Sequence, residues 1–99
     1  MILVTGSVTA REDSLEEVRR LSLEHVHRSR GEPGCISHAV HADCENPLRL
    51  VFLEQWTDRA ALGTHFAVPA SRDFVRTLKS LAAGASTIEI FDASGVENL

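Results

Sequence analysis

Residues 35–56 read CISHAVHADCENPLRLVFLEQW, and this stretch decides the fold. It contains two runs of strand-forming residues that are separated by the break at Cys44–Pro47. Side chains that alternate with a period of two are typical of a β-strand, and a break that contains proline is typical of a turn. We therefore predict two consecutive strands, over residues 35–43 and 48–56.

The faces of these two strands follow from the alternation. In the first strand, one face carries Ile36, His38, Val40 and Ala42, and the other carries Cys35, Ser37, Ala39 and His41. In the second strand, one face carries Leu50, Phe52, Glu54 and Trp56, and the other carries Arg49, Val51, Leu53 and Gln55. The second strand is thus apolar on both faces, and such a strand is normally covered on both sides.

The flanking sequence supplies the remaining elements. We predict a strand over residues 2–10, a helix to about Arg30, a short helix over 58–66, a further helix from Pro69 to Gly84, and a last strand over 87–93. Ser14 and Glu17 have the spacing of a capping box at the start of the first helix. Gly6 interrupts the first strand, which indicates a bulge or a close approach to the backbone.

The predicted order is therefore β-α-β-β-α-β, the ferredoxin-like arrangement of the α+β class. An antiparallel four-stranded sheet then carries the helices on one face, and the opposite face, with Val51 and Leu53, stays bare. A chain of 99 residues buries a smaller share of its surface than a longer chain does. Because an exposed apolar sheet face marks an interaction surface, we expect a homodimer through this open face.

The composition indicates one domain over residues 1–99, with its core at about 2–93 and a polar tail at 94–99. The formal net charge is −4 and the basic residues are scattered, so we expect no nucleic-acid partner. We find neither a signal peptide nor a membrane span, and we expect a cytoplasmic protein without a membrane partner. In that compartment, Cys35 and Cys44 are packing or loop residues.

Polar residues interrupt the sheet-facing side of the first predicted helix. Ser22, His25 and Ser29 fall on the same helical face as Leu15 and Val18. Three polar groups on successive turns suggest the wall of a cavity, and the alternative is a solvated flank of the helix. His27 lies off this face and is expected to be exposed.

A second candidate site begins at the end of the strand over 48–56. His65 follows Glu54 by eleven residues and lies on the short helix that begins near Asp58. If the two side chains meet, the carboxylate can orient the imidazole and make it a better base. The alternative is that His65 packs over Trp56 while Glu54 serves only as a cap or an ion-pair partner.

His38 shares its strand face with apolar residues, so that His25, His38 and His65 can converge on one site. Three imidazoles can bind zinc or iron. The one H-x-H pair, His25 and His27, does not share a helical face, the chain has no H-x₃-H pair, and we predict no metal site. His41 has the opposite parity to His38 and cannot join it.

A family resemblance arises from the combination of Glu32-Pro33-Gly34-Cys35, the motif Glu54-Gln55-Trp56, and Ala61-Leu62 followed by His65. This pattern resembles the antibiotic biosynthesis monooxygenase family over about residues 2–91. The resemblance implies a dimeric α+β barrel in which each subunit holds a pocket between helices and sheet. Some members of the family oxidise phenolic polyketides to quinones with dioxygen and no metal or flavin, and others degrade haem or isomerise a phosphorylated signal molecule.

Glu54, Trp56 and His65 match the functional positions of that family directly. Haem-degrading members carry an Asn in the first strand, where this chain has Gly6 and Ser7, and this departure argues against haem chemistry. His38 replaces an aromatic residue that is common in the family, and the chain contains no tyrosine.

The resemblance and the residue types together predict a monooxygenase that needs no cofactor and acts on a small aromatic or polyphenolic molecule with dioxygen. His65 or His25 is the expected base, and Glu54 is expected to hold it. The expected substrate-binding residues are Trp56, His38, Ser22, Ser29, Phe52, Phe66 and Arg72. The alternatives are an acid/base isomerase, for which Arg72 anchors a phosphorylated substrate, and a dimeric ligand-binding domain without catalysis.

Overall fold

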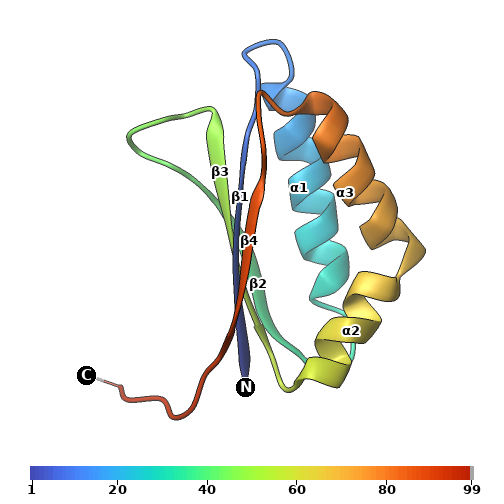
Figure 1. Cartoon of the computed structure of the whole chain (residues 1–99), viewed down its shortest axis with the longest axis vertical. Helices are drawn as coiled ribbons and strands as arrows, with labels where there is room; N and C mark the ends of the chain where they lie inside the picture. Colours follow the sequence, from blue (N-terminus) through green and yellow to red (C-terminus); the bar gives the residue numbers. More distant parts are fainter. Residues whose placement is uncertain (99) are drawn as a thin grey trace.

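A computed structural model describes residues 1–98, which form four strands and three helices. In chain order these are β1 (Ile2–Thr9), α1 (Leu15–Ser29), β2 (Cys35–Ala42), β3 (Arg49–Trp56), α2 (Arg59–Ala67), α3 (Pro69–Leu81) and β4 (Thr87–Asp92). All three helices lie on one side of the sheet (Figure 1). The predicted element order and the one-sided helix layer are confirmed.

The sheet has the strand order β2-β3-β1-β4, and all neighbouring strands are antiparallel. The ferredoxin-like α+β fold is therefore confirmed. Glu54 of β3 lies opposite Val4 of β1 and His38 of β2, so that it sits near the middle of the sheet on the helix side. The register of β1 continues through Gly6 on both sides, and the alternative of a bulge at this glycine is wrong.

The starts of α2 and α3 follow from local chemistry, as predicted. The Asp58 carboxylate accepts a hydrogen bond of 2.8 Å from the backbone N–H of Ala61, which satisfies one free donor at the start of α2. Pro69 is the first residue of α3, where its missing N–H costs nothing and its fixed φ suits the helix. The two helices are therefore separated by Val68 alone.

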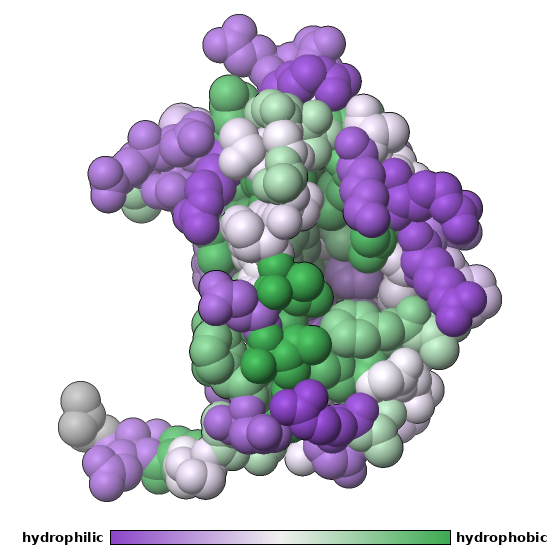
Figure 2. Space-filling model, viewed as in Figure 1, coloured by the Kyte–Doolittle hydropathy of each residue, from purple (hydrophilic) through white to green (hydrophobic). Residues whose placement is uncertain are grey.

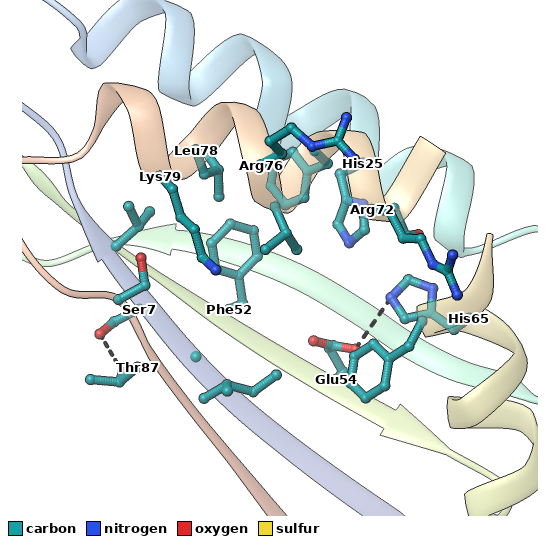
Figure 3. Close-up of a pocket in the computed structure, with 18 residues that line it drawn as sticks. Ser7, His25, Phe52, Glu54, His65, Arg72, Arg76, Leu78, Lys79 and Thr87 are labelled. Atoms are coloured by element: carbon teal, nitrogen blue, oxygen red, sulfur yellow. Dashed lines mark hydrogen bonds and ion pairs between the residues drawn. The ribbon is translucent and has the colours of Figure 1, made fainter. Parts of the chain in front are cut away.

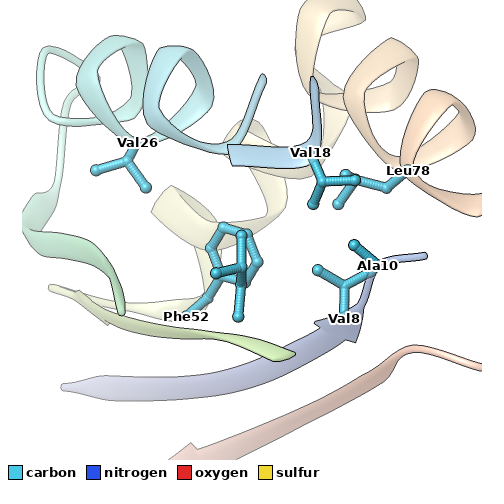
Figure 4. Close-up of a cluster of buried hydrophobic side chains, with 7 residues drawn as sticks. Val8, Ala10, Val18, Val26, Phe52 and Leu78 are labelled. Carbon is cyan, nitrogen blue, oxygen red and sulfur yellow. The ribbon is translucent and has the colours of Figure 1, made fainter. Parts of the chain in front are cut away.

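The core consists of two clusters of buried apolar side chains. The main cluster fills the space between α1, α3 and the sheet (Figure 4), and its members are Val8, Ala10, Val18, Val26, Leu50, Phe52 and Leu78. The second cluster is formed by Ile2, Val4, Trp56 and Leu62. Burying one such side chain stabilises a fold by about 1.5–3 kcal/mol, so these residues hold the helices on the sheet.

The prediction that Ile36 shares a face with His38, and that Cys35 lies on the other face of β2, is wrong. A register shift between Cys35 and Ser37 reverses the alternation there, because a β-bulge adds one residue to one strand. Cys35 consequently packs against the second cluster, while Ile36 is 51% exposed. From His38 onward the alternation follows the prediction, and His38 points to the helix side.

The capping box at the start of α1 is also wrong. The Ser14 hydroxyl donates a hydrogen bond of 2.7 Å to the carbonyl of Leu81 and makes no capping bond to α1. Glu17 instead forms an ion pair with Arg20 on the same helix. A contact between distant segments thus replaces the local one that the spacing suggested.

The helix α3 ends at Leu81, three residues before the predicted end at Gly84. Ala82 has an extended backbone and forms a bridge with Ala10, and the N–H of Ala83 donates to the carbonyl of Thr9 over 2.8 Å. Pairing with the end of β1 therefore stops the helix before the glycine does.

The sheet face away from the helices is uncovered in the chain, as predicted. Leu53 of β3 and Phe91 of β4 lie on this face, and they are 43% and 44% exposed. Among the helices of residues 1–98, none combines the length and the apolar character that crossing a bilayer requires.

Candidate functional site

Three buried histidine side chains meet between the sheet and the helices. His25 comes from α1, His38 from β2 and His65 from α2, and their ring centroids are 5.2–5.6 Å apart. Each of them is at most 6% exposed. The rings lie between the two core clusters, because His25 stacks on Phe74 at a centroid distance of 4.1 Å and His65 packs on Trp56 at 4.6 Å.

Glu54 forms the floor of this cluster. Its Oε1 atom accepts a hydrogen bond of 2.9 Å from the indole N–H of Trp56, and the same atom lies 3.3 Å from His38 Nε2. Burial alone would raise the pKa of Glu54, but the neighbouring His38, the Trp56 N–H and His65 outweigh that effect and lower it below the usual value. Glu54 is therefore a buried carboxylate that carries negative charge at neutral pH.

His65 is held by a different carboxylate, that of Glu32. Its Nδ1 atom lies 2.8 Å from Glu32 Oε1, whereas its Nε2 atom is 3.9 Å from Glu54 Oε1. A carboxylate can only accept, so that Nδ1 carries a proton, and in the neutral ring the lone pair lies on Nε2. The prediction that Glu54 orients His65 is thus corrected: Glu32 orients the ring, and Glu54 lies near the nitrogen that is left free.

The turn at Gly34 brings Glu32 close to α2, the helix that carries His65. Gly34 has φ of +84°, a conformation that favours glycine, and a Cβ atom there would overlap the Cβ of Ala61. From the sequence, Glu32 is only the first residue of a turn motif, because nothing in the local pattern shows that a residue 33 positions later will contact it.

His25 has the opposite proton arrangement. The Arg28 guanidinium nitrogen Nη2 lies 2.8 Å from His25 Nδ1 and also donates to the hydroxyl of Ser71 over 3.1 Å. Because a guanidinium can only donate, Nδ1 of His25 accepts and the ring proton lies on Nε2. Burial, together with the nearby His38, His65 and Arg28, lowers the pKa of His25 to about 3. His25 is therefore a neutral hydrogen-bond donor.

A cavity of about 660 Å³ lies next to these side chains, between α3 and the sheet. Its walls are mainly apolar, and Figure 3 shows His25, Glu54 and His65 together at one end of it. Of the predicted site residues, His25, Phe52, Glu54, His65, Phe66 and Arg72 line the cavity. In the space-filling view the molecule is hollowed between a hydrophobic surface and a hydrophilic flank over α3 (Figure 2).

Four of the predicted site residues are not among those that line the cavity. Trp56 is 0% exposed and packs in the second core cluster against His65, and His38 is 2% exposed with its Nε2 atom 3.3 Å from Glu54 Oε1. Ser29 donates a hydrogen bond of 2.6 Å to the carbonyl of His25 within α1. Ser22 is fully buried, and its hydroxyl has no partner among residues 1–98. Neither serine forms the cavity wall that the helical pattern suggested.

Other lining residues were not predicted to belong to the site. Gly6 of β1 lies on the cavity floor, and Phe74, Arg76 and Lys79 of α3 form part of its upper wall. The interruption of β1 at Gly6 was the only local signal, because a Cβ there would lie 3.1 Å from the carbonyl oxygen of Thr87. The residues of α3 follow an ordinary amphipathic pattern, which does not show that a cavity lies beneath it.

The histidine cluster can be compared with a metal site. The three rings offer nitrogen atoms that all lie within 4.8 Å of one another. Three imidazoles on one zinc ion hold their nitrogens about 3.4 Å apart, given bonds of about 2.1 Å. Moreover, the bond from Arg28 leaves a proton on His25 Nε2, so this nitrogen donates rather than ligates. As arranged, the cluster suits hydrogen bonding and proton transfer.

Comparison with known proteins gives concordant results. A sequence model described as "Antibiotic biosynthesis monooxygenase" matches residues 1–77. An uncharacterized protein of Synechocystis is 35% identical over 98 residues, which are 99% of this chain and 67% of that protein. A crystal structure of an antibiotic biosynthesis monooxygenase is 28% identical with a TM-score of 0.88, covering 96% of this chain and 100% of the other. A protein of Deinococcus radiodurans, named as a candidate enzyme of this type, is 25% identical with a TM-score of 0.95, covering 100% and 98%.

Proposed function

Because this chain belongs to the antibiotic biosynthesis monooxygenase family, we propose that it is a small monooxygenase that oxidises a phenolic aromatic molecule with dioxygen. Family membership supports a monooxygenase-like function in general. The observation that carries the finer proposal is the arrangement of His65, which lines the cavity together with Glu54: Glu32 holds its Nδ1, and its Nε2 lies 3.9 Å from Glu54 Oε1.

His65 acts as the base in this proposal. Its Nε2 atom removes the proton of a phenolic hydroxyl group at the buried end of the cavity. The Glu32 carboxylate then lies against the Nδ1–H of an imidazolium, and the Glu54 carboxylate lies 3.9 Å from Nε2. Both negative charges stabilise the protonated ring, which is the state that forms during the reaction.

His25 serves as a donor rather than as a second base. Its pKa of about 3 keeps it neutral at ordinary pH, and Arg28 keeps the proton on Nε2. A neutral N–H group next to the base can donate a hydrogen bond to the oxygen anion that proton removal creates. The Arg72 side chain, which lines the cavity near His65 in Figure 3, adds a positive charge for the same anion.

The oxidation step balances without a further reductant. The phenolate passes electrons from its para carbon to dioxygen, and a carbon–oxygen bond forms. His65 returns its proton to the outer oxygen, the O–O bond breaks, and the ring carbon loses its hydrogen as a C=O group forms. The products are a quinone and one water, so the substrate gives up four electrons and dioxygen accepts four.

The apolar walls protect this chemistry from water. Phe52, Phe66 and Phe74 line the cavity beside the histidines, and exclusion of water keeps the electron-rich anion reactive. Trp56 and His38 act on the site through Glu54: the indole N–H of Trp56 donates to Glu54 Oε1, and His38 Nε2 lies 3.3 Å from the same atom. They are therefore positioning residues in this proposal.

The open face of the sheet is the proposed dimer interface. Leu53 and Phe91 are exposed on this face although both are large and apolar, and a second copy would cover them. A homodimer of this kind gives two cavities per molecule, each on the far side of its sheet from the contact.

Oxygen uptake with an anthrone-like phenolic substrate tests the proposed function. Wild-type protein is expected to consume one dioxygen per quinone formed, and His65→Gln to lower kcat by about 10²-fold or more. His27→Gln is the matched control, because His27 is exposed on the surface and does not line the cavity. Full turnover by His65→Gln would overturn the assignment of the base, and substrate conversion without oxygen uptake would favour an isomerase.

A further inference from the structure

We propose that the cavity end opposite His65 binds an oxyanion, a carboxylate or a phosphate ester, through Lys79, so that the substrate is an aromatic phenol with an acidic group at its other end. This inference rests on the proposed function, since it names the class of substrate for the same cavity. It follows from where the charged side chains of α3 lie.

The charged residues that line the cavity from α3 are all positive. Arg72, Arg76 and Lys79 stand at intervals of four and three residues, so they form one row along the helix. From Arg72 to Lys79 this row extends about 10 Å at a rise of about 1.5 Å per residue. Figure 3 shows Arg72 beside His65 and Lys79 at the other end, beside Phe52 and Ser7.

No acidic side chain balances this row at the Lys79 end. Among residues 1–98, the only acidic residue that lines the cavity is Glu54, and it is buried with Trp56 and His38 at the histidine end. Positive charge therefore gathers at the cavity in a protein whose formal net charge is −4. A local potential of this sign attracts anionic ligands and raises their local concentration.

Of the three cations, Arg76 already has an ion-pair partner, because it lies 3.3 Å from the carboxylate of Asp73 on the same helix. Arg72 has none among residues 1–98, but it stands beside His65 at the other end of the cavity. Within residues 1–98, Lys79 takes part in no ion pair and no side-chain hydrogen bond. Its ammonium group is thus free to bind a ligand without first breaking a contact.

The sheet forms the floor of the Lys79 end. Ser7 of β1, Ser86 before β4, and Thr87 of β4 line the cavity there, but the Ser7 and Thr87 hydroxyls hydrogen-bond to each other over 2.6 Å on the open face of the sheet. The Lys79 ammonium group is therefore the donor for carboxylate or phosphate oxygens at this end. Between this end and the histidines the walls are apolar, which suits the aromatic body of the ligand.

A pair of probes that differ only in charge tests the inference. We expect 6-hydroxy-2-naphthoic acid to bind wild-type protein about five-fold tighter than its neutral primary amide, as measured by calorimetry in low salt. This factor corresponds to the upper range for an exposed ion pair. The phosphate analogue, 6-hydroxy-2-naphthyl phosphate, then shows whether carboxylate or phosphate is preferred. Raising the salt concentration should reduce the advantage of either anion over the amide.

Variants identify the residue. Lys79→Gln should lower the affinity for both anions to that for the amide and leave the amide unchanged, whereas Lys79→Arg should retain the preference. Arg19→Gln removes the same charge from an exposed position on α1 outside the cavity and should change nothing. Equal binding of acid and amide by wild type, an unchanged preference in Lys79→Gln, or no binding of any probe would overturn the inference. The proposed function fails separately, by absence of wild-type oxygen uptake with neutral phenolic substrates.

Discussion

The Nδ1 atom of His65 on α2 lies 2.8 Å from the Oε1 atom of Glu32, a residue of the turn that precedes β2. This contact joins two segments that are 33 residues apart, and it determines which nitrogen of His65 is free to act. The neighbouring His25 is set in the opposite way by Arg28. The cavity therefore faces one ring that can accept a proton and one that can donate a hydrogen bond.

Removing the charge of Glu32 tests this relationship. Glu32→Gln keeps the size of the side chain but removes the negative charge that stabilises a protonated His65. We expect kcat for oxygen uptake to fall about ten-fold, with little change in KM, because the charge matters mainly after proton transfer.

A spectroscopic measurement separates positioning from simple loss of stability. The hydrogen-bonded Nδ1 proton of His65 should give a distinct ¹⁵N–¹H signal in wild type that shifts or disappears in Glu32→Gln. Glu45→Gln removes a carboxylate from an exposed turn and should affect neither quantity. Equal kcat values for Glu32→Gln and wild type would contradict the role of Glu32.

Substitution of Gly34 should destabilise the fold. Gly34→Ala forces a Cβ into the left-handed region and against Ala61, and we expect the free energy of unfolding in urea to fall by about 2 kcal/mol or more. Gly84→Ala is the control, because a Cβ there meets nothing within 4 Å. A loss for Gly34→Ala no larger than for Gly84→Ala would contradict this account of the turn.

Stability should fall in mild acid because of His25. In the unfolded chain His25 binds a proton near its ordinary pKa of 6.5, whereas in the folded protein its pKa is about 3. Between these values the unfolded state holds more protons, so lowering the pH from 6.5 toward 4 favours unfolding. The contribution of His25 is at most about 1.4 kcal/mol per pH unit.

Urea unfolding between pH 4 and 7 measures this dependence. His25→Gln should make the free energy of unfolding less steeply dependent on pH, while His27→Gln should leave the slope as in wild type, since His27 is exposed on the same helix. The same slope in His25→Gln and wild type would show that His25 is not held neutral.

Charge on the open sheet face should prevent the proposed dimer. Leu53→Lys places an ammonium group in the centre of that face, and we expect the mass from light scattering to change from dimer to monomer. Leu23→Lys on α1 is the matched control, because Leu23 is 46% exposed and Leu53 is 43% exposed. A monomeric wild type, or a dimeric Leu53→Lys protein, would refute this interface.

The two buried serines of α1 should respond differently to alanine. Ser29→Ala loses a hydrogen bond of 2.6 Å, and we expect a cost of about 1 kcal/mol in the free energy of unfolding. Ser22→Ala removes a buried hydroxyl without a partner among residues 1–98, and we expect no loss or a small gain in stability. A larger loss at Ser22 than at Ser29 would show that Ser22 has a partner in solution.

The sequence by itself determined the element order, the strand that carries Glu54 and Trp56, and the uncovered face around Leu53. These features depend on periodicity, glycine and proline positions, and helix starts such as Asp58, all of which act within a few residues of the chain. Local signals failed where distant segments compete with them. The Ser14 hydroxyl bonds to Leu81, and α3 ends at Leu81 because the chain then pairs with β1.

The tertiary structure alone decided the chemistry of the site. The sequence identified His25, His38, His65 and Glu54 as candidates, but hydrogen bonds between remote residues assign their roles. Glu32 binds Nδ1 of His65 and so determines that Nε2 is the free nitrogen, and the bulge in β2 determines which side chains share a face with His38. A proton's position on an imidazole depends on which atom lies within about 3 Å of each ring nitrogen, and only the folded chain brings those atoms together.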